Sequence, residues 1–140
     1  MEWTGEWTGG CLCGRVRYRA NESPRWASYC HCGMCRKVSG APFMGFVEFP
    51  GGDVEWLGEE ARRYESSQGV IRRFCGTCGS SLTFEADGMV FIALGSLDHP
   101  EQVTVERHAY AASRLPGLMF VDDLPDFPGP VGGKGGRPID

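Results

Sequence analysis

The chain has 140 residues, with 14 Lys and Arg against 18 Asp and Glu, and a formal net charge of −4 at pH 7. This acidic balance argues against nucleic-acid binding, and the longest apolar runs are too short to cross a bilayer as a helix. The first residues lack the basic and apolar regions of a secretory signal. We therefore expect a cytoplasmic protein that binds neither nucleic acid nor membrane.

The predicted elements are short strands separated by turn residues, which indicates an all-β fold. The first, Arg15–Ala20, alternates charged and apolar residues, so every second residue from Val16 would share one face of a strand. Further strands are expected, in chain order, at residues 43–49, 54–57, 70–74, 82–84, 90–94 and 103–110. Asp87-Gly88 predicts a two-residue hairpin turn within this series. Only residues 33–39 and 100–103 are expected to form helical turns.

The organisation of the chain predicts one domain followed by a tail. A chain of this length most often forms a single core, and we expect it to occupy residues 1–128. Residues 129–140 are mostly Gly, Pro and charged residues. This composition buries too little apolar surface to order the chain, so we expect a disordered tail there.

Seven cysteines are grouped in three clusters, Cys11/Cys13, Cys30/Cys32/Cys35 and Cys75/Cys78. An odd number of clustered cysteines in a reducing compartment favours metal binding over disulfides. Residues i and i+2 of an extended strand point to the same face, so a C-x-C pair can aim two thiolates at one point. A C-x-x-C turn does the same through a tight loop.

These spacings predict two zinc ions per chain with different roles. Four thiolates saturate a tetrahedral zinc, whereas three leave one position for water or a thiol. We therefore predict a structural zinc on Cys11, Cys13, Cys75 and Cys78 and a second, catalytic zinc on Cys30, Cys32 and Cys35. The alternative, in which Cys75 and Cys78 join Cys32 and Cys35, would leave three thiols unused and is disfavoured.

The neighbours of the middle cluster suggest how it is supported. His31 lies between two cysteines that share a face, so we interpret it as a supporting or core residue rather than a fourth ligand. Arg36 and Lys37 follow Cys35 directly. Their positive charge would lower the thiol pKa values and attract an anionic ligand, which makes both residues candidate anion contacts. No general base is evident, and His108 stays open between a role in the site and a structural one.

Taken together, these motifs resemble the glutathione-dependent formaldehyde-activating enzyme (GFA) family, also described as the CENP-V/GFA domain. The resemblance extends from about residue 9 to residue 127. It rests on Gly10-Cys11-Leu12-Cys13-Gly14, Cys30-His31-Cys32-x-x-Cys35-Arg36-Lys37, Phe74-Cys75-x-x-Cys78-Gly79-Ser80, Leu94-Gly95-Ser96-Leu97-Asp98, His108 and Asp122-x-Leu124-Pro125-x-Phe127.

The resemblance implies a fold, two metal sites and an activity. The fold would be Mss4-like, with coiled antiparallel β-sheets stapled by zinc, and the two ligand sets would be those given above. The founding activity of the family joins formaldehyde to glutathione as S-(hydroxymethyl)glutathione, formally a carbon–sulfur lyase reaction. We therefore expect a small-molecule thiol and an aldehyde as partners of a monomer or homodimer. The alternative is a non-catalytic zinc-stapled β module that binds a thiol ligand or a protein partner.

Overall fold

The structure is a computed structural model that describes residues 5–131 and divides them into two compact units. The first unit comprises residues 5–25 and 47–104, and the second comprises residues 26–46 and 105–131. Strand β4 (Met44–Pro50) runs from the second unit into the first. The single domain expected over residues 1–128 stays a prediction, and residues 132–140 of the expected tail lie outside the described residues.

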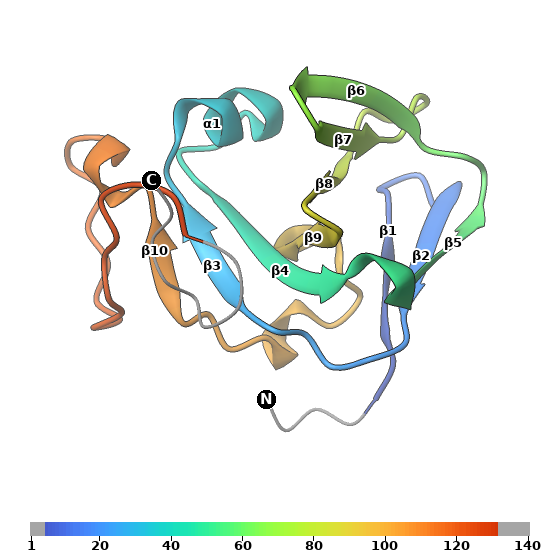
Figure 1. The fold of residues 1–140 in the computed structure, drawn as a ribbon, viewed down its shortest axis with the longest axis horizontal. Coiled ribbons are helices and arrows are strands. Elements are labelled where there is room, and N and C mark those ends of the chain that lie inside the picture. The colour runs from blue at the N-terminus through green and yellow to red at the C-terminus, as the bar shows by residue number, and fades with distance from the viewer. Residues whose placement is uncertain (1–4, 132–140) are drawn as a thin grey trace. The chain divides into compact units, whose positions relative to one another are not determined.

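A three-stranded antiparallel sheet forms one part of the first unit. It contains β1 (Trp7–Gly10), β2 (Val16–Ala20) and β5 (Val54–Gly58), in the order β1-β2-β5 (Figure 1). The alternate residues of β2, beginning at Val16, are at most 3% exposed, which confirms the predicted buried face. Gly9 of β1 lies against the hydroxyl of Tyr18, and a side chain at this position would collide with it.

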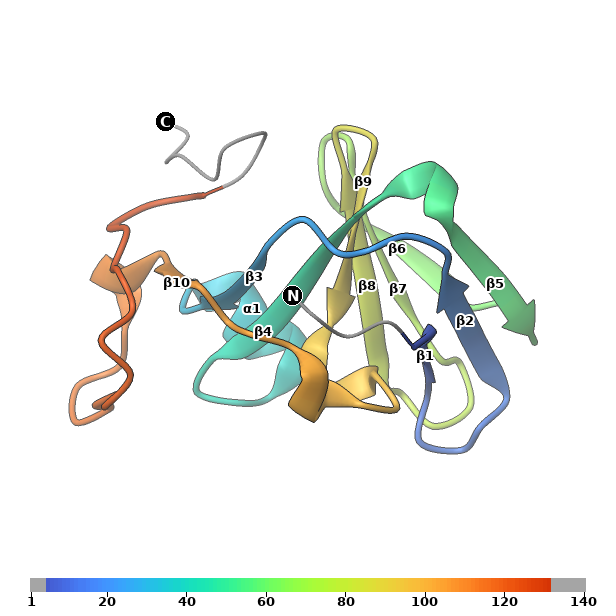
Figure 2. The same cartoon turned by 90° about the horizontal axis from the view of Figure 1, so that it is seen from below.

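Four consecutive antiparallel strands form the other part of this unit. They are β6 (Arg62–Ser67), β7 (Val70–Phe74), β8 (Ser81–Ala86) and β9 (Met89–Ala93), and they lie side by side in Figure 2. The predicted hairpin turn is confirmed, because Ala86 pairs with Met89 and both Asp87 and Gly88 have positive φ. The largest fully buried side chains of the unit include Tyr18, Phe49, Leu82 and Ile92.

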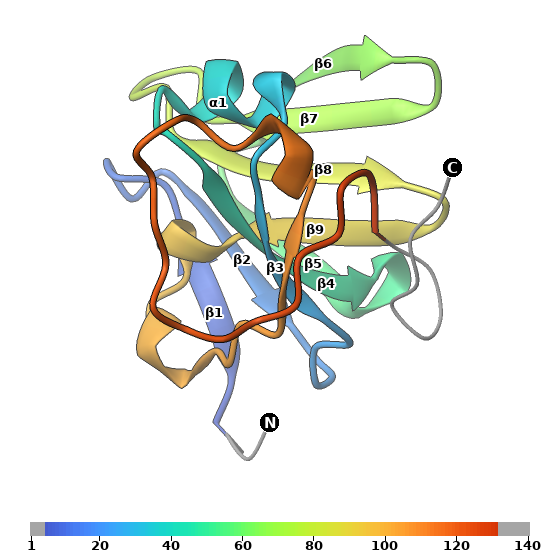
Figure 3. The same ribbon diagram turned by 90° about the vertical axis from the view of Figure 1, so that its left-hand side faces the viewer.

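The second unit is built on a parallel pair of short strands. β3 (Ala27–Cys30) pairs with β10 (Arg107–Ala109), with Tyr29 opposite His108 and Cys30 opposite Ala109 (Figure 3). This pair departs from the purely antiparallel sheets expected. Parallel neighbours need a long connection, and here the whole chain between residues 30 and 107 supplies it. Helix α1 (Gly33–Ser39) follows β3 directly, as predicted.

The all-β prediction is confirmed, since α1 is the single α-helix among residues 5–131. Short 3-10 turns occur at Gly51–Asp53, Leu94–Ser96, Pro100–Gln102 and Ala111–Ser113. Strands β1, β3 and β6 were not predicted, and β10 is shorter than the predicted strand over residues 103–110. Within the described part of the chain, no helix has the length and apolar character that a membrane span requires.

Candidate metal centres

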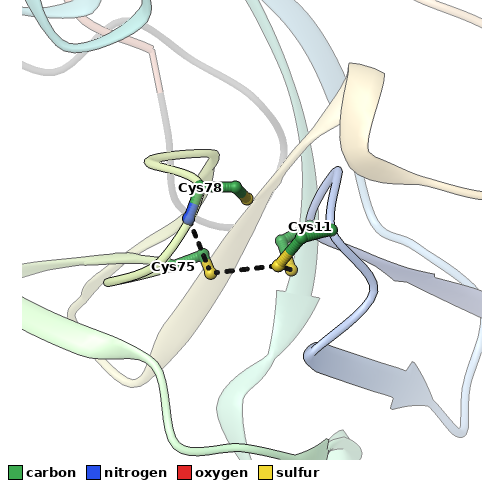
Figure 4. A group of neighbouring side chains, drawn as sticks. Cys11, Cys75 and Cys78 are labelled. Carbon is green, nitrogen blue, oxygen red and sulfur yellow. Dashed lines mark hydrogen bonds between the residues drawn. The ribbon is translucent and has the colours of Figure 1, made fainter.

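The first cysteine cluster lies in the first unit and combines two loops. Cys11 and Cys13 follow β1, and Cys75 and Cys78 belong to the turn that follows β7. The four sulfur atoms lie within 4.8 Å of one another, with Cys13 Sγ 3.5 Å from Cys11 Sγ and 3.7 Å from Cys75 Sγ. Figure 4 shows Cys75 and Cys78 on one loop facing Cys11 on the other. The structure therefore brings together the four cysteines that the spacing had paired.

Backbone and hydroxyl groups surround these sulfurs with hydrogen-bond donors. Val16 N–H donates to Cys11 Sγ at 3.3 Å, and Cys78 N–H donates to Cys75 Sγ at 3.4 Å. The hydroxyl of Ser80, 3.2 Å from Cys78 Sγ, helps to lower the pKa of that thiol to about 5. Donors aimed at sulfur stabilise the thiolate, which is the form that binds metal.

Ser80 also connects the two loops of the cluster. Its Oγ accepts the N–H of Leu12 at 3.0 Å, between the two cysteines of the other loop. The Ser80 hydroxyl is therefore engaged by the backbone of one loop and by a sulfur of the other.

The donor set of the first cluster fits a tetrahedral zinc. A Zn–S bond of ~2.3 Å implies a sulfur–sulfur edge of about 3.8 Å, and the measured separations of 3.5 and 3.7 Å are close to it. Four thiolates complete the coordination of such an ion. This site is therefore closed to a further ligand.

The second cluster lies in the second unit, where one strand end and one helix start meet. Cys30 ends β3, Cys32 precedes α1, and Cys35 lies in its first turn. Cys35 Sγ lies 3.0 Å from Cys30 Sγ and 3.2 Å from Cys32 Sγ. Cys30 and Cys35 are buried, whereas Cys32 is half-buried. The cluster therefore has two inner sulfurs and one that reaches the surface.

The three thiols interact closely enough that their pKa values move in opposite directions. The hydrogen bonds from Cys30 and Cys35 lower the pKa of Cys32 to about 2, and the backbone N–H of Cys35 also donates to its sulfur at 3.3 Å. The interaction with Cys32 in turn raises the pKa of Cys30 to about 12, and the interaction with Cys30 raises the pKa of Cys35. A divalent cation bound among the three sulfurs would stabilise all of them as thiolates.

The donor chemistry of the second cluster fits zinc with one position left open. Cys35 Sγ lies 0.6 to 0.8 Å closer to the other two sulfurs than the tetrahedral edge of about 3.8 Å. A bound ion would therefore separate them. Among the described residues, no His, Asp or Glu completes the group as a fourth ligand. His31, between two of the ligands, is not part of the group.

The structure places the two predicted anion contacts on α1. Arg36 Nη1 donates to the carbonyl oxygens of His31 and Ser113, the latter at 2.7 Å. This nitrogen of the guanidinium therefore links the backbone at His31, between two cysteines of the second cluster, to the backbone at Ser113. Lys37 lies on the same helix and is exposed.

Three residues near the second cluster were not singled out as a group by the sequence. His108 and Asp122 join His31 in a hydrogen-bonded chain. Tyr110 follows Ala109, the partner of Cys30, and its backbone has a left-handed φ of 52°. Burial and the charge of the three cysteines raise the pKa of its hydroxyl. His108 and the Asp-x-Leu-Pro motif of Asp122 each carried a sequence signal, whereas Tyr110 carried none as a site residue.

Comparison with known proteins agrees with this architecture. A relative from Schizosaccharomyces pombe, described as an uncharacterized lyase, is 35% identical over 79 residues, which cover 56% of this chain and 57% of that protein. A crystal structure of a Rhodobacter sphaeroides protein shares the fold with a TM-score of 0.55 and 18% identity, and the match covers 86% of this chain and 99% of the other. The family model for the glutathione-dependent formaldehyde-activating enzyme matches residues 6–113. The chain therefore belongs to the GFA family.

Proposed function

We propose that this protein is a zinc-dependent carbon–sulfur lyase of the GFA type. It would add a thiol, glutathione or a similar molecule, to formaldehyde or another small aldehyde, or catalyse the reverse reaction. The observation that carries the proposal is the pairing of a closed four-cysteine cluster with a separate cluster of only three. Family membership and the lyase description of the fungal relative support the reaction class.

The reaction that we propose is an addition in which no atom is oxidised or reduced overall, so it needs no redox partner. The sulfur of the thiol forms a bond to the aldehyde carbon, the carbon–oxygen double bond becomes single, and the thiol proton ends on the oxygen. A zinc ion with an open position, when bound, supplies Lewis acidity and lowers the pKa of a thiol. Cys30, Cys32 and Cys35 would hold that ion, with the half-buried Cys32 on the side accessible to substrate.

Arg36 and Lys37 are proposed to recognise the negative charge of the thiol substrate. Arg36 Nη1 donates to two carbonyl oxygens, so the other guanidinium donors and the ammonium of Lys37 are the groups proposed for the substrate. A substrate with carboxylates, such as glutathione, would suit this pair because an arginine fork and an ammonium both bind carboxylates. The thiol would then be positioned by its charged parts.

Zinc content and turnover, measured on the same samples, test the proposal. The purified chain should contain two zinc ions by mass spectrometry and should accelerate hemithioacetal formation above the uncatalysed rate. Cys32→Ser should retain one zinc and lose the acceleration. Leu12→Ser changes an 89% exposed residue of the first cluster and should retain both properties.

Two results would contradict the proposal. A wild-type protein with only one zinc would remove the open site on which it depends. A wild-type protein with two zinc ions that accelerates no combination of several thiols and aldehydes would instead be the non-catalytic thiol-binding module.

A further inference from the structure

A chain of three polar side chains crosses the second unit, and the proposed function gives it no task. His31 Nε2 lies 2.9 Å from His108 Nδ1, and His108 Nε2 lies 2.9 Å from Asp122 Oδ2. The two imidazole side chains are fully buried, whereas the Asp122 side chain is 29% exposed. The chain therefore links a surface carboxylate to the residue between two cysteines of the second cluster.

Asp122 sets the direction of both hydrogen bonds. The N–H of Leu124 donates to Asp122 Oδ1 at 3.1 Å, and this bond, with that from His108, holds the pKa of the carboxyl below its usual value. A carboxylate only accepts hydrogen bonds, so His108 Nε2 carries a proton. In the neutral ring His108 Nδ1 then accepts, and His31 Nε2–H donates to it. His31 is left with an unprotonated Nδ1, a buried atom without a hydrogen-bond partner.

Aromatic rings enclose the two imidazoles and exclude water from the chain. The Phe43 ring lies 5.7 Å from that of His31, and the Phe120 ring lies 5.4 Å from His31 and 4.5 Å from His108, between centroids. Tyr29 lies 5.5 Å from His108. Hydrogen bonds in such a low-dielectric enclosure are stronger than those in water, and breaking one leaves a costly unpaired group.

The backbone connects this chain to the cysteines. The N–H of His31 donates to Ala109 O at 3.0 Å, so the segment continues the pairing of β3 with β10 beyond Cys30. Cys32 is also extended, with φ −67° and ψ 156°. Successive side chains of an extended segment point in opposite directions. Holding the imidazole of His31 on one side therefore directs the sulfurs of Cys30 and Cys32 to the other.

We propose that Asp122, His108 and His31 form a positioning chain that aims Cys30 and Cys32 at one point and so sets the metal affinity of the second cluster. The inference rests on the proposed function only in requiring that this cluster binds a metal ion. None of the three residues touches the ion or the substrate. Loss of hydrogen-bonded groups behind a metal site typically weakens metal binding ~10–100-fold. We expect about tenfold, the lower end of that range, because this chain acts through the backbone.

The test extracts zinc from the holo-protein with graded amounts of a chromophoric chelator at pH 7. Asp122→Asn keeps the shape of the side chain but adds an amide donor, so the fixed direction of the hydrogen bonds is lost. The second zinc should leave this variant at about tenfold lower chelator, whereas the first cluster, an internal reference, should not change. Asp123→Asn is the matched control because this position has a φ of 53°, which Asn tolerates.

Replacing the zinc with Co²⁺ reports the coordination geometry of the second cluster separately from its metal affinity. The visible bands of the cobalt-loaded second site should shift in Asp122→Asn and stay unchanged in Asp123→Asn. The circular dichroism spectra of both variants should match that of the wild type. A change in the direction of the cysteine sulfurs is thereby distinguished from a loss of the fold. Unchanged cobalt bands and unchanged zinc extraction in Asp122→Asn, with two zinc ions in the wild type, would overturn the positioning chain and leave the proposed function intact. A wild type with one zinc would overturn both.

Nitrogen NMR of the wild-type holo-protein gives a test that needs no variant, should Asp122→Asn fail to fold. His31 and His108 should both show a protonated Nε2 and an unprotonated Nδ1 at pH 7. An Nδ1–H form, a doubly protonated ring, or the shift of a metal-bound Nδ1 at His31 would refute the chain.

Discussion

The two metal centres should contribute very differently to folding, because they close loops of very different length. Cys13 and Cys75 of the first cluster are 62 positions apart, whereas Cys30 and Cys35 of the second are separated by only 5. Joining positions so far apart removes loop entropy from the unfolded chain worth about 4 kcal/mol at 25 °C, against about 2 kcal/mol for the short loop. The first metal should therefore stabilise the fold by about 2 kcal/mol more than the second.

Two matched double variants isolate this difference. Cys75→Ser/Cys78→Ser opens the long loop, and Cys32→Ser/Cys35→Ser removes the short one. Each pair replaces one buried and one half-buried thiol, so the cost of burying a hydroxyl is similar in both. For a chain of this size, ~1 kcal/mol corresponds to roughly 2–4 °C in Tm. The first variant should thus melt roughly 4–8 °C below the second.

The assay is thermal unfolding of zinc-loaded samples, followed by circular dichroism, with zinc content measured on each. Both double variants should contain one zinc, and removing all zinc from the wild type should bring its Tm down to or below that of Cys75→Ser/Cys78→Ser. Equal melting temperatures for the two variants would refute the loop-closure reasoning. A lower melting temperature for Cys32→Ser/Cys35→Ser would in addition assign the structural role to the second cluster and the reactive role to the first.

Three further changes in the first unit have defined outcomes. Arg17 Nη1 donates to Asp98 at 3.0 Å and holds the pKa of that carboxyl below its usual value. The stability that this ion pair contributes is complete above about pH 4 and is lost as the pH falls through the lower folded pKa. Asp98→Asn should therefore lower the free energy of unfolding at pH 7 and make that free energy fall less steeply in acid, as urea unfolding at several pH values would measure. Tyr18→Phe removes the 2.6 Å hydrogen bond to Ser96 and should cost about 1 kcal/mol in urea unfolding; an unchanged midpoint would contradict it. Gly88→Ala should cost ~1–2 kcal/mol in the same assay, because φ is 76° although the space is open, and a stabilised variant would disprove the strain.

Local chemistry was enough to predict the elements whose signal lies within a few residues. The alternation that begins at Val16 predicted a strand with one buried face, since side chains alternate along any strand. Asp87-Gly88 predicted a turn because few residues adopt positive φ readily. The cysteine spacing predicted which thiols share a face, for the same geometric reason.

Strands without such a signal were missed. β6 (Arg62–Ser67) contains no apolar alternation, and most of its side chains are exposed; it is a strand because it pairs with β7. β10 (Arg107–Ala109) was predicted, but as a longer strand over residues 103–110; its bounds are set by β3 on one side and by the segment near Pro125, whose carbonyl accepts the N–H of His108, on the other. Pairing with distant segments formed these strands, and single-sequence patterns do not contain that information.

The sequence by itself determined the three groups of neighbouring cysteines, the all-β character and the short helix after Cys32. The tertiary structure decided between the two pairings that the spacing allowed, in favour of Cys11 and Cys13 with Cys75 and Cys78, and it alone showed that His31 reaches Asp122 through His108. The physical reason is distance along the chain. Spacing fixes the directions of neighbouring side chains, whereas contacts between residues more than sixty positions apart depend on which strands pair and on what their packing buries.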